Sequence, residues 1–444
     1  MPPAPSKPRK RIRARAKEAV SYLGRLTTLV AALAVVAAIY ISLRTFVVGR
    51  LVRDYAQAVI NQLATADVER VGRVEVDADG NLVLHRIEIT TTRNGVKRLF
   101  YRADRAVIAL DGWPLRDSDL RVARIDLFRP EFFVRREQVD GWNLLWALHR
   151  RPAPAAPEGP PPPPAPPAPR LAPAAPRDPF PFNGVHLHEG IVHVALEGRS
   201  GREVSYLITG VEAQIARREG KLVFEPLYGD FYGGRLAGHA IIRSITPFAI
   251  DVRLAVTDAD VSLLAERAAF SSRPVTGHLN GVLAVTADAS TQHRPIGAGR
   301  LEISKGNLYD LPAFTGILGL LALNPVPDRI VNSAQVLFTA ERDHVRIDEM
   351  NFLGSPISLF GEGTMGLTGE DLHVVLVPRL EKSWGSILPI IGAPLQILAD
   401  IALGNLVPLV VTGTFWEPKV NAEPDKPLSE DIKKRAGGGE HPPK

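Results

Sequence analysis

The sequence predicts a mostly β protein in which an N-terminal transmembrane helix precedes a long curved antiparallel β-sheet with a few covering helices. Three observations support this fold class. A run of 18 residues without charge follows a basic N-terminus, short alternating apolar and polar segments recur from residue 74 to 415, and glycine pairs recur beside these segments. Such glycines allow a long sheet to bend or coil, and hairpin turns are the alternative explanation for them.

The apolar run at residues 26–43 is the first predicted element. As a helix it would measure about 27 Å, close to the hydrocarbon thickness of a bilayer. Residues 44–48 extend it if Arg44 snorkels, which gives a signal anchor over residues 26–48. A cleaved signal peptide and a buried soluble helix are the alternatives, but the run is longer than most signal peptides and lacks a polar face.

The positive charge of the chain is confined to its N-terminus. Residues 1–25 carry eight basic side chains and one acidic side chain, a net charge of +7, whereas the whole chain carries +5. The remaining residues are therefore slightly acidic, and we expect no nucleic-acid partner. The positive-inside rule predicts that this basic tail is cytoplasmic and that the bulk of the chain lies across the membrane.

Composition divides the rest of the chain. Residues 152–181 contain 15 of the 38 prolines, a composition that forms neither helix nor interior strand. This Pro-rich linker is predicted to be a spacer that interrupts the sheet, and it can also serve as a recognition segment for other proteins. It separates an N-terminal β region at 49–151 from a C-terminal β region at 182–422, and residues 423–444 are predicted to be a disordered tail.

Both regions are predicted to consist mainly of strands. Three helices are expected, at residues 51–64, 311–323 and 386–403, of which the last two are apolar enough to cover the sheet or to face a membrane. The strands, about 16 to 18 in all by their alternation and turn signals, are predicted at 74–77, 82–89, 106–110, 122–128, 185–197, 203–217, 221–228, 234–243, 248–257, 277–287, 298–304, 334–340, 344–352, 356–366, 371–379 and 407–415.

Motifs for catalysis or cofactor binding are weak. Gly361 to Gly366 match G-x-G-x-x-G in letters, but a strand-like segment follows where phosphate binding needs a helix N-terminus. His186, His188 and Glu189, with His193 nearby, have metal-binding residue types but no third ligand at a recognised spacing. The chain also has no cysteine for disulfides, thiolate metal sites or nucleophiles. We therefore expect no catalytic residue, cofactor or metal.

Alternation along four strands predicts the lining of an apolar groove. One face of each carries apolar side chains, while the other carries Gln335, Thr339, Arg346, Asp348 and Ser358. An ordinary filled sandwich core would show the same alternation. The predicted lining residues are Val336, Phe338, Val345, Ile347, Ile357, Leu359, Val374 and Leu376.

The order of these features resembles the AsmA-like and TamB-like envelope proteins, which belong to the repeating β-groove, bridge-like lipid-transfer group. After the anchor come strand residues 122–134, interrupted by Pro130, and the element Asp140-Gly141-Trp142-Asn143-Leu144. The C-terminal half adds Gly299 to Leu308, Leu311-Pro312, Leu388 to Pro394 and Val411 to Val420. The resemblance implies a taco-like sheet whose apolar trough shields acyl chains, and it implies a protein that is not an enzyme.

This resemblance leads to two hypotheses about function. The first is an inner-membrane-anchored periplasmic protein that binds or transfers phospholipid or another acyl lipid and supports outer-membrane biogenesis. The second is a non-enzymatic periplasmic scaffold or assembly factor, acting on other envelope proteins through its Pro-rich segment. A trough would favour the first, because each CH₂ of an acyl chain left in water costs roughly 0.8 kcal/mol.

Overall fold

The computed structural model describes residues 66–77, 79–93, 95–111, 121–137, 141–143, 183–245, 248–267, 275–288, 295–308, 311–321, 331–341, 343–354, 357–380, 400–401, 403 and 405–437. The predicted basic tail, the anchor at 26–48, the helix at 51–64, the Pro-rich linker and most of the helix at 386–403 lie outside these residues. Within the described part of the chain, no helix is both long and apolar enough to cross a membrane.

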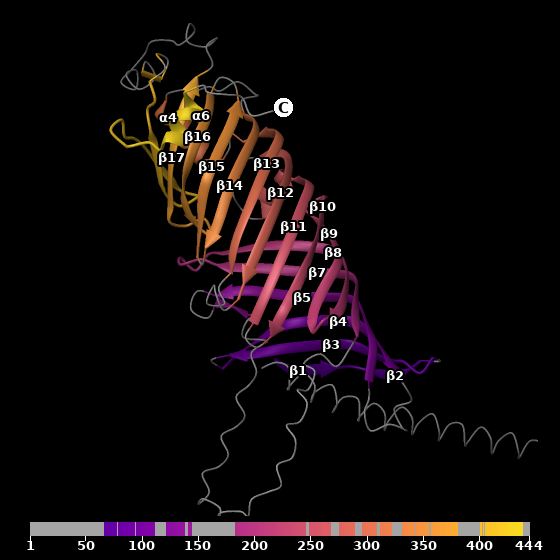
Figure 1. Ribbon diagram of the computed structural model, residues 1–444. Coiled ribbons are helices and arrows are strands. Elements are labelled where there is room, and N and C mark those ends of the chain that lie inside the picture. Colours follow the sequence, from indigo (N-terminus) through magenta and orange to yellow (C-terminus); the bar gives the residue numbers. More distant parts are fainter. Residues whose placement is uncertain are drawn as a thin grey trace, which may run out of the picture.

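One large sheet dominates the molecule, which confirms the prediction of a mostly β fold with a long curved sheet (Figure 1). It contains 19 strands, but β1 and β2 pair with successive parts of β3, and β6 has two residues, so 17 full strand positions follow one another. In Figure 1 the strand direction turns progressively from β3 at one end to β16 at the other.

The strands mostly follow one another in chain order and pair as antiparallel neighbours. They are β1 (Ala66–Val71), β2 (Val74–Val76), β3 (Leu82–Arg93), β4 (Val96–Asp111), β5 (Arg121–Glu137), β6 (Gly141–Trp142), β7 (Gly184–Glu197), β8 (Glu203–Arg218), β9 (Lys221–Phe231), β10 (Gly234–Ile245), β11 (Phe248–Asp260), β12 (Thr276–Ala287), β13 (Ile296–Asn307), β14 (Val331–Glu341), β15 (His344–Gly354), β16 (Ile357–Gly366), β17 (Leu372–Leu380), β18 (Leu409–Gly413) and β19 (Pro418–Ala422).

Many strands are longer than the sequence predicts, and bulges explain why. The strand predicted at 122–128 was expected to end before Pro130, but Arg129 adopts a positive φ of 48° and β5 continues to Glu137. On the adjacent strand β7, Glu189 has a φ of 54°. A bulge lets a strand accommodate a proline or a change of face without ending. Residues that usually end a strand, such as proline, therefore also occur inside strands of this sheet, where they mark bulges.

The sheet continues across the Pro-rich linker, contrary to the prediction that the linker interrupts it. β5 pairs with β7 from Ile125 opposite Val185 to Arg136 opposite Leu196. This pair is parallel, whereas the predicted sheet was antiparallel throughout. Parallel neighbours need a long crossover connection, and the segment between Asn143 and Asn183 supplies it. The two predicted β regions therefore form one sheet.

Three helices complete the described structure: α3 (Val261–Arg267), α4 (Pro312–Leu320) and α6 (Glu430–Ala436). α4 confirms the predicted helix at 311–323; its proline stands in the first turn, where no N–H is needed. α3 was not predicted, because its seven residues are too few for a periodic signal. α4 buries Phe314, Ile317 and Leu318 in the main apolar cluster at the C-terminal end of the sheet.

The prediction of a disordered tail is wrong for residues 423–437. Helix α6 begins after Ser429, whose hydroxyl accepts a hydrogen bond from the N–H of Ile432 and donates one to Glu362 (2.8 Å). Ile432 is fully buried and Ala436 is buried with it, against Phe360 and Val377. Although this segment is rich in charge and proline, Ile432 and Ala436 form an apolar pair at i, i+4. This pair is enough to pack one short helix against the sheet.

Candidate functional site

A cavity of about 380 Å³ lies between β8 on one side and β12 to β15 on the other, with α3 at its wall. Its lining is almost entirely apolar, so the inner faces of two distant parts of the sheet meet around it. Native interiors contain few voids larger than a water molecule. The lining residues are Val204, Tyr206, Val261, Leu264, Ala265, Val275, Leu279, Leu301, Ile303, Leu308, Leu311, Ala334, Val336, Phe338, Val345, Ile347, Met350, Phe352, Met365, Leu367, Thr368, Gly369 and Phe415.

The eight predicted lining residues divide into two groups of four. Those on β14 and β15 line the cavity: Val336, Phe338, Val345 and Ile347. Those on β16 and β17 do not line it but belong to the packed apolar cluster that includes α4 and β18; these are Ile357, Leu359, Val374 and Leu376, with exposures of 1–4%. The predicted residues on β14 and β15 therefore border the cavity, whereas those on β16 and β17 are packed. The two groups share one cluster, because Ile347 is 5% exposed and belongs to it, and Met365 of β16 also lines the cavity.

Part of the cavity wall is less tightly buried than that packed cluster, although Leu308, Ala334 and Ile347 line the cavity and belong to the cluster as well. The side chain of Leu301 is 37% exposed, and those of Val336, Phe338 and Val345 are half-buried. Phe338 lies across Gly299 of the neighbouring strand β13: a Cβ at this glycine would come within 2.5 Å of the ring. Here the recurring glycines make room for a large cross-strand side chain. Gly361 does the same for Leu376, where an added Cβ would lie 2.4 Å from Cδ2.

The opposite face of β13 to β15 is polar, as the alternation predicts. Asp348 accepts hydrogen bonds from Thr339 (2.8 Å) and Arg346 (2.7 Å). The side-chain oxygen of Gln335 accepts from Arg300 (2.7 Å). These pairs hold a solvated outer face, so the apolar residues between them point to the inner side of the sheet.

Tyr206 and Thr368 bring polar atoms to the apolar lining. Burial, and to a smaller extent the neighbouring Tyr232, raises the pKa of Tyr206 to about 12. The phenol therefore stays protonated in any physiological solution and adds no charge to the cavity.

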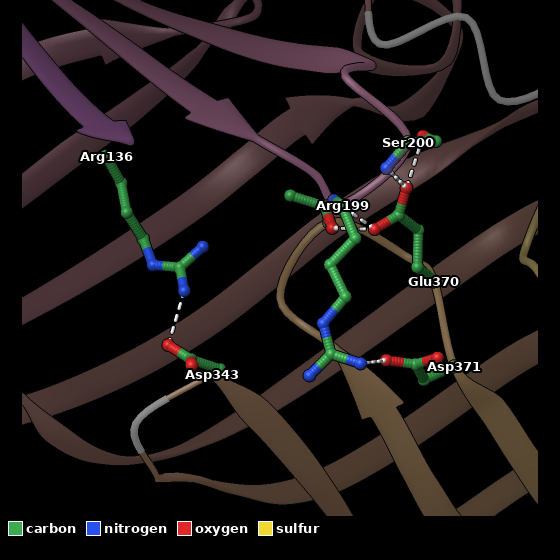
Figure 2. A network of polar contacts seen from close by, with 7 residues as sticks. Arg136, Arg199, Ser200, Asp343, Glu370 and Asp371 are labelled. Carbon is green, nitrogen blue, oxygen red and sulfur yellow. Dashed lines mark hydrogen bonds and ion pairs between the residues drawn. The ribbon is translucent and has the colours of Figure 1, made fainter. Parts of the chain in front are cut away.

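A network of polar contacts joins loops that come from distant parts of the sheet (Figure 2). We call this network the clasp, formed by Arg136, Arg199, Ser200, Asp343, Glu370 and Asp371. It ties the turn between β7 and β8 to the turn between β16 and β17, and residues of the second turn, Leu367 to Gly369, line the cavity. The clasp therefore holds two distant parts of the sheet together around the apolar space.

Glu370 is the centre of the clasp. Its carboxylate accepts hydrogen bonds from the backbone N–H groups of Arg199 (2.6 Å) and Ser200 (3.0 Å) and from the Ser200 hydroxyl, and it is 8% exposed. Gly198 makes this approach possible, because an added Cβ would lie 2.9 Å from the carboxylate. Burial favours a raised pKa, but the hydrogen bonds from Ser200 and Arg199 outweigh it and lower the pKa of Glu370.

Two ion pairs flank this carboxylate. Arg199 contacts Asp371 at 2.7 Å with both side chains largely exposed, and Arg136, itself well buried, contacts Asp343. The guanidinium of Arg202 also lies 4.0 Å above the ring of Trp416. Exposed pairs contribute little stability by themselves, so we expect the Glu370 contacts to carry most of the clasp.

The structure also places the weaker motifs. Gly361 to Gly366 lie inside β16, and a turn and then β17 follow, so no helix N-terminus is available for a phosphate. His186 and His188 lie on one face of β7 as predicted. Asp126, which the sequence did not associate with them, lies beside both, because β5 and β7 are parallel neighbours.

Sequence reasoning missed most of the lining: the residues of β8, β12 and β13, the remaining ones of β14 to β16, and those outside the predicted strands. The predicted strand at 203–217 contains Val204 and Tyr206, but nothing local indicates that it faces β13 to β15. That relation depends on how the whole sheet curves. The helix α3 and the β16–β17 turn contribute for the same reason.

No protein-family model, no curated protein and no solved structure matches this chain. The fold and the cavity therefore carry the functional argument by themselves.

Proposed function

We propose that this protein binds an acyl lipid, with phospholipid the favoured class, in the apolar cavity between β8 and β12 to β15. In this proposal it is an AsmA-like protein of the bacterial envelope, anchored in the inner membrane through residues 26–48 with its sheet in the periplasm. It supports outer-membrane biogenesis by binding or transferring lipid and performs no catalysis.

The cavity is the observation that supports this proposal. Its volume of about 380 Å³ falls in the usual range for ligand sites, and its lining is almost entirely apolar. The cavity is partly open to solvent, so without a ligand its apolar walls face water, and each Å² of apolar surface left in water costs about 25 cal/mol. An apolar occupant that covers these walls removes that cost.

Acyl chains match the cavity better than a polar ligand does. Each methylene removed from water contributes roughly 0.8 kcal/mol, so every carbon of a chain that enters the cavity favours binding. Within the lining, Tyr206 and Thr368 supply polar atoms without charge, which suits the ester region of a lipid better than an ionic group.

Photo-crosslinking in cells tests the proposal on the full chain. A benzophenone amino acid replaces Phe338 in one variant and Gln335, three residues away on the outer face of the same strand, in the control. We expect lipid adducts, identified by mass spectrometry, at position 338 and none at 335. A folded protein that forms no acyl adduct at 338, or equal amounts at both positions, would contradict lipid binding in this cavity.

Charge substitutions give a second test. Phe338→Glu places a carboxylate among apolar side chains and is expected to abolish co-purification of phospholipid. The matched control, Gln335→Glu, adds the same charge beside Arg300 and is expected to retain it. Equal lipid content in both folded variants would favour the scaffold hypothesis over lipid binding.

A further inference from the structure

A second candidate site lies on the parallel strand pair, away from the cavity. Asp126 of β5 stands in register with His186 of β7, and His188 follows two residues later on the same face. One ligand atom from each of the three residues lies within 4.8 Å of the others. Their neighbours Leu127, Val185 and Leu187 alternate with them and pack in apolar clusters, so the three polar side chains lie on the other face of the sheet.

The spacing of these atoms fits a tetrahedral metal site. Asp126 Oδ1 lies 3.3 Å from His186 Nδ1 and 3.7 Å from His188 Nε2. Ligands bound at about 2.0–2.2 Å in a tetrahedron are separated by roughly 3.4 Å. Two edges of the tetrahedron are thus already near their final lengths, and the third joins two imidazoles whose ligand atoms lie within 4.8 Å of each other.

Neighbouring groups orient His188 for this role. Its other ring nitrogen, Nδ1, lies 3.4 Å from Glu212 Oε2, and Glu212 is itself held by the N–H of Glu189 at 2.8 Å. The ring of Phe128 stacks on the imidazole, with centroids 5.0 Å apart. A metal-binding histidine usually donates its other N–H to a carboxylate, which directs the free nitrogen at the metal.

Asp126 keeps one carboxylate oxygen available to a cation. It is buried and Arg124 takes only one of its oxygens, donating to Oδ2 at 2.9 Å, so that Oδ1 remains directed at the histidines. Asp126 and Glu212 raise the affinity for a cation. Arg124 lowers it, as does Arg105, whose guanidinium lies 4.0 Å over the Phe128 ring. Two imidazoles with one carboxylate select zinc and its neighbours in the first transition row over magnesium or calcium.

We propose that Asp126, His186 and His188 bind one divalent transition-metal ion, with Zn²⁺ as the reference, and that Glu212 acts as a positioning residue for His188. Three protein ligands leave a fourth position to water. The bound ion links β5 to β7, the two strands that flank the long crossover, and is therefore expected to stabilise this junction of the sheet. The site is independent of the cavity and of the proposed function.

The test measures Zn²⁺ binding to the full chain, purified without a polyhistidine tag, by isothermal titration calorimetry. We expect one ion per chain, no binding in the double variant His186→Gln/His188→Gln and about tenfold weaker binding in Glu212→Gln. His278→Gln is the control, because His278 also contacts a carboxylate, Asp258 at 2.8 Å, but has no second histidine assigned to it. It should bind as the unaltered chain does.

Two readouts keep the test decisive if a variant misfolds. Co²⁺ bound to the unaltered protein should give the intense visible absorption of a tetrahedral site, and Zn²⁺ should protect His186 and His188, but not His278, from diethylpyrocarbonate. Absence of stoichiometric binding to the unaltered chain, or equal protection of all three histidines, would overturn the proposal. Undiminished binding by a folded double variant would overturn it as well.

Discussion

The inner face of β14 and β15 and the inner face of β16 and β17 carry the same alternating pattern but differ in what lies against them. On β14 and β15, Val336 and Phe338 border a cavity and remain half-buried. On β16 and β17, Leu359 and Val374 are 1% and 3% exposed in a packed cluster. The two regions are adjacent in one sheet, and their strands pair as antiparallel neighbours from β14 to β17, with register shifts at Leu337/Phe338 and Ile347/Met350.

The covering elements account for this difference. At the C-terminal end, β18 and α4 contribute Leu409, Phe314 and Ile317 to the cluster with β16 and β17. The ring of Phe314 also meets Phe352 of β15, at the border of the cavity, edge-on with centroids 4.7 Å apart. Over β14 and β15 the nearest opposing strand is β8, and a space remains between them. Alternation along a strand therefore shows which face is apolar, and the elements packed against that face decide whether it encloses a core or a cavity.

The largest contrast is expected between removing a leucine side chain from the packed cluster and removing one from the cavity wall. Leu359→Ala leaves a hole in a filled cluster and should lower the free energy of unfolding by about 2–5 kcal/mol. Leu301→Ala, made at the partly exposed cavity wall, should cost about 1 kcal/mol or less, because less apolar area is lost from burial. Denaturant unfolding of the delipidated chain measures both. Equal losses would mean that the cavity wall is packed as tightly as the cluster.

Adding one methylene sharpens the comparison. Val374→Ile overfills the packed cluster and should destabilise the fold by about 1–3 kcal/mol. Val336→Ile extends into the cavity and should be neutral or stabilising by up to about 0.8 kcal/mol. The thermal midpoints of the two variants, measured without lipid, should therefore move in opposite directions or differ clearly. A similar loss in both would show that no space is available beside Val336.

Glu370→Gln tests whether the clasp maintains the boundary of the cavity. The substitution should cost about 1–2 kcal/mol at neutral pH, because hydrogen bonds to a charged group are stronger than those to a neutral amide. The pKa of Glu370 is lowered in the folded state, so its stabilising contribution is complete above the unfolded pKa of about 4.3 and is lost as the pH falls through the lower folded value.

The pH dependence supplies the control for this clasp variant. Unfolding free energies measured from neutral pH down to acid should converge for the unaltered chain and Glu370→Gln below the folded pKa of Glu370. A constant difference across the whole range would mean that the charge of the carboxylate contributes nothing to the clasp.

The smallest effect is expected at the exposed pair of the clasp. Arg199→Ala removes the contact with Asp371 but leaves the backbone N–H that Glu370 accepts, so the loss should be about 0–1 kcal/mol. Raising the salt concentration should weaken the pair further in the unaltered chain. A loss as large as that of Glu370→Gln would show that the ion pair, and not the carboxylate, secures this edge of the cavity.

Most of the fold could be predicted from the sequence, because strand alternation and turn residues are local signals. β8, β10 and β16 lie close to their predicted ranges, and the apolar run with Pro312 predicted α4. β19 and α6 were missed because each is short and lies in a segment rich in charge and proline. The length of β5 was underestimated because a bulge at Arg129 carries the strand past Pro130.

The candidate sites could be predicted only in part. Alternation identified Val336 and Phe338 as inward-facing, but it gave Leu359 the same role, since a strand carries no information about what covers it. The association of Asp126 with His186 was beyond the sequence signals, because the two residues are 60 positions apart and meet through a parallel pairing across a proline-rich segment. Contacts that depend on the curvature or the connection of the sheet have no local pattern.

The parallel pairing of β5 with β7 also sets a limit on the chain that joins them. Because Asn143 lies beside Arg135 while the pairing of β7 starts opposite Ile125, ten residues earlier on β5, the connection must return along the sheet by about 33 Å, or roughly 11 extended residues. The sequence provides 39 residues between Asn143 and Asn183. Each doubling of a flexible loop adds only about 0.6 kcal/mol of closure entropy. The sheet thus imposes a minimum length on this connection but almost no maximum, so added sequence can be carried there at little cost to the cavity or to the strands around it.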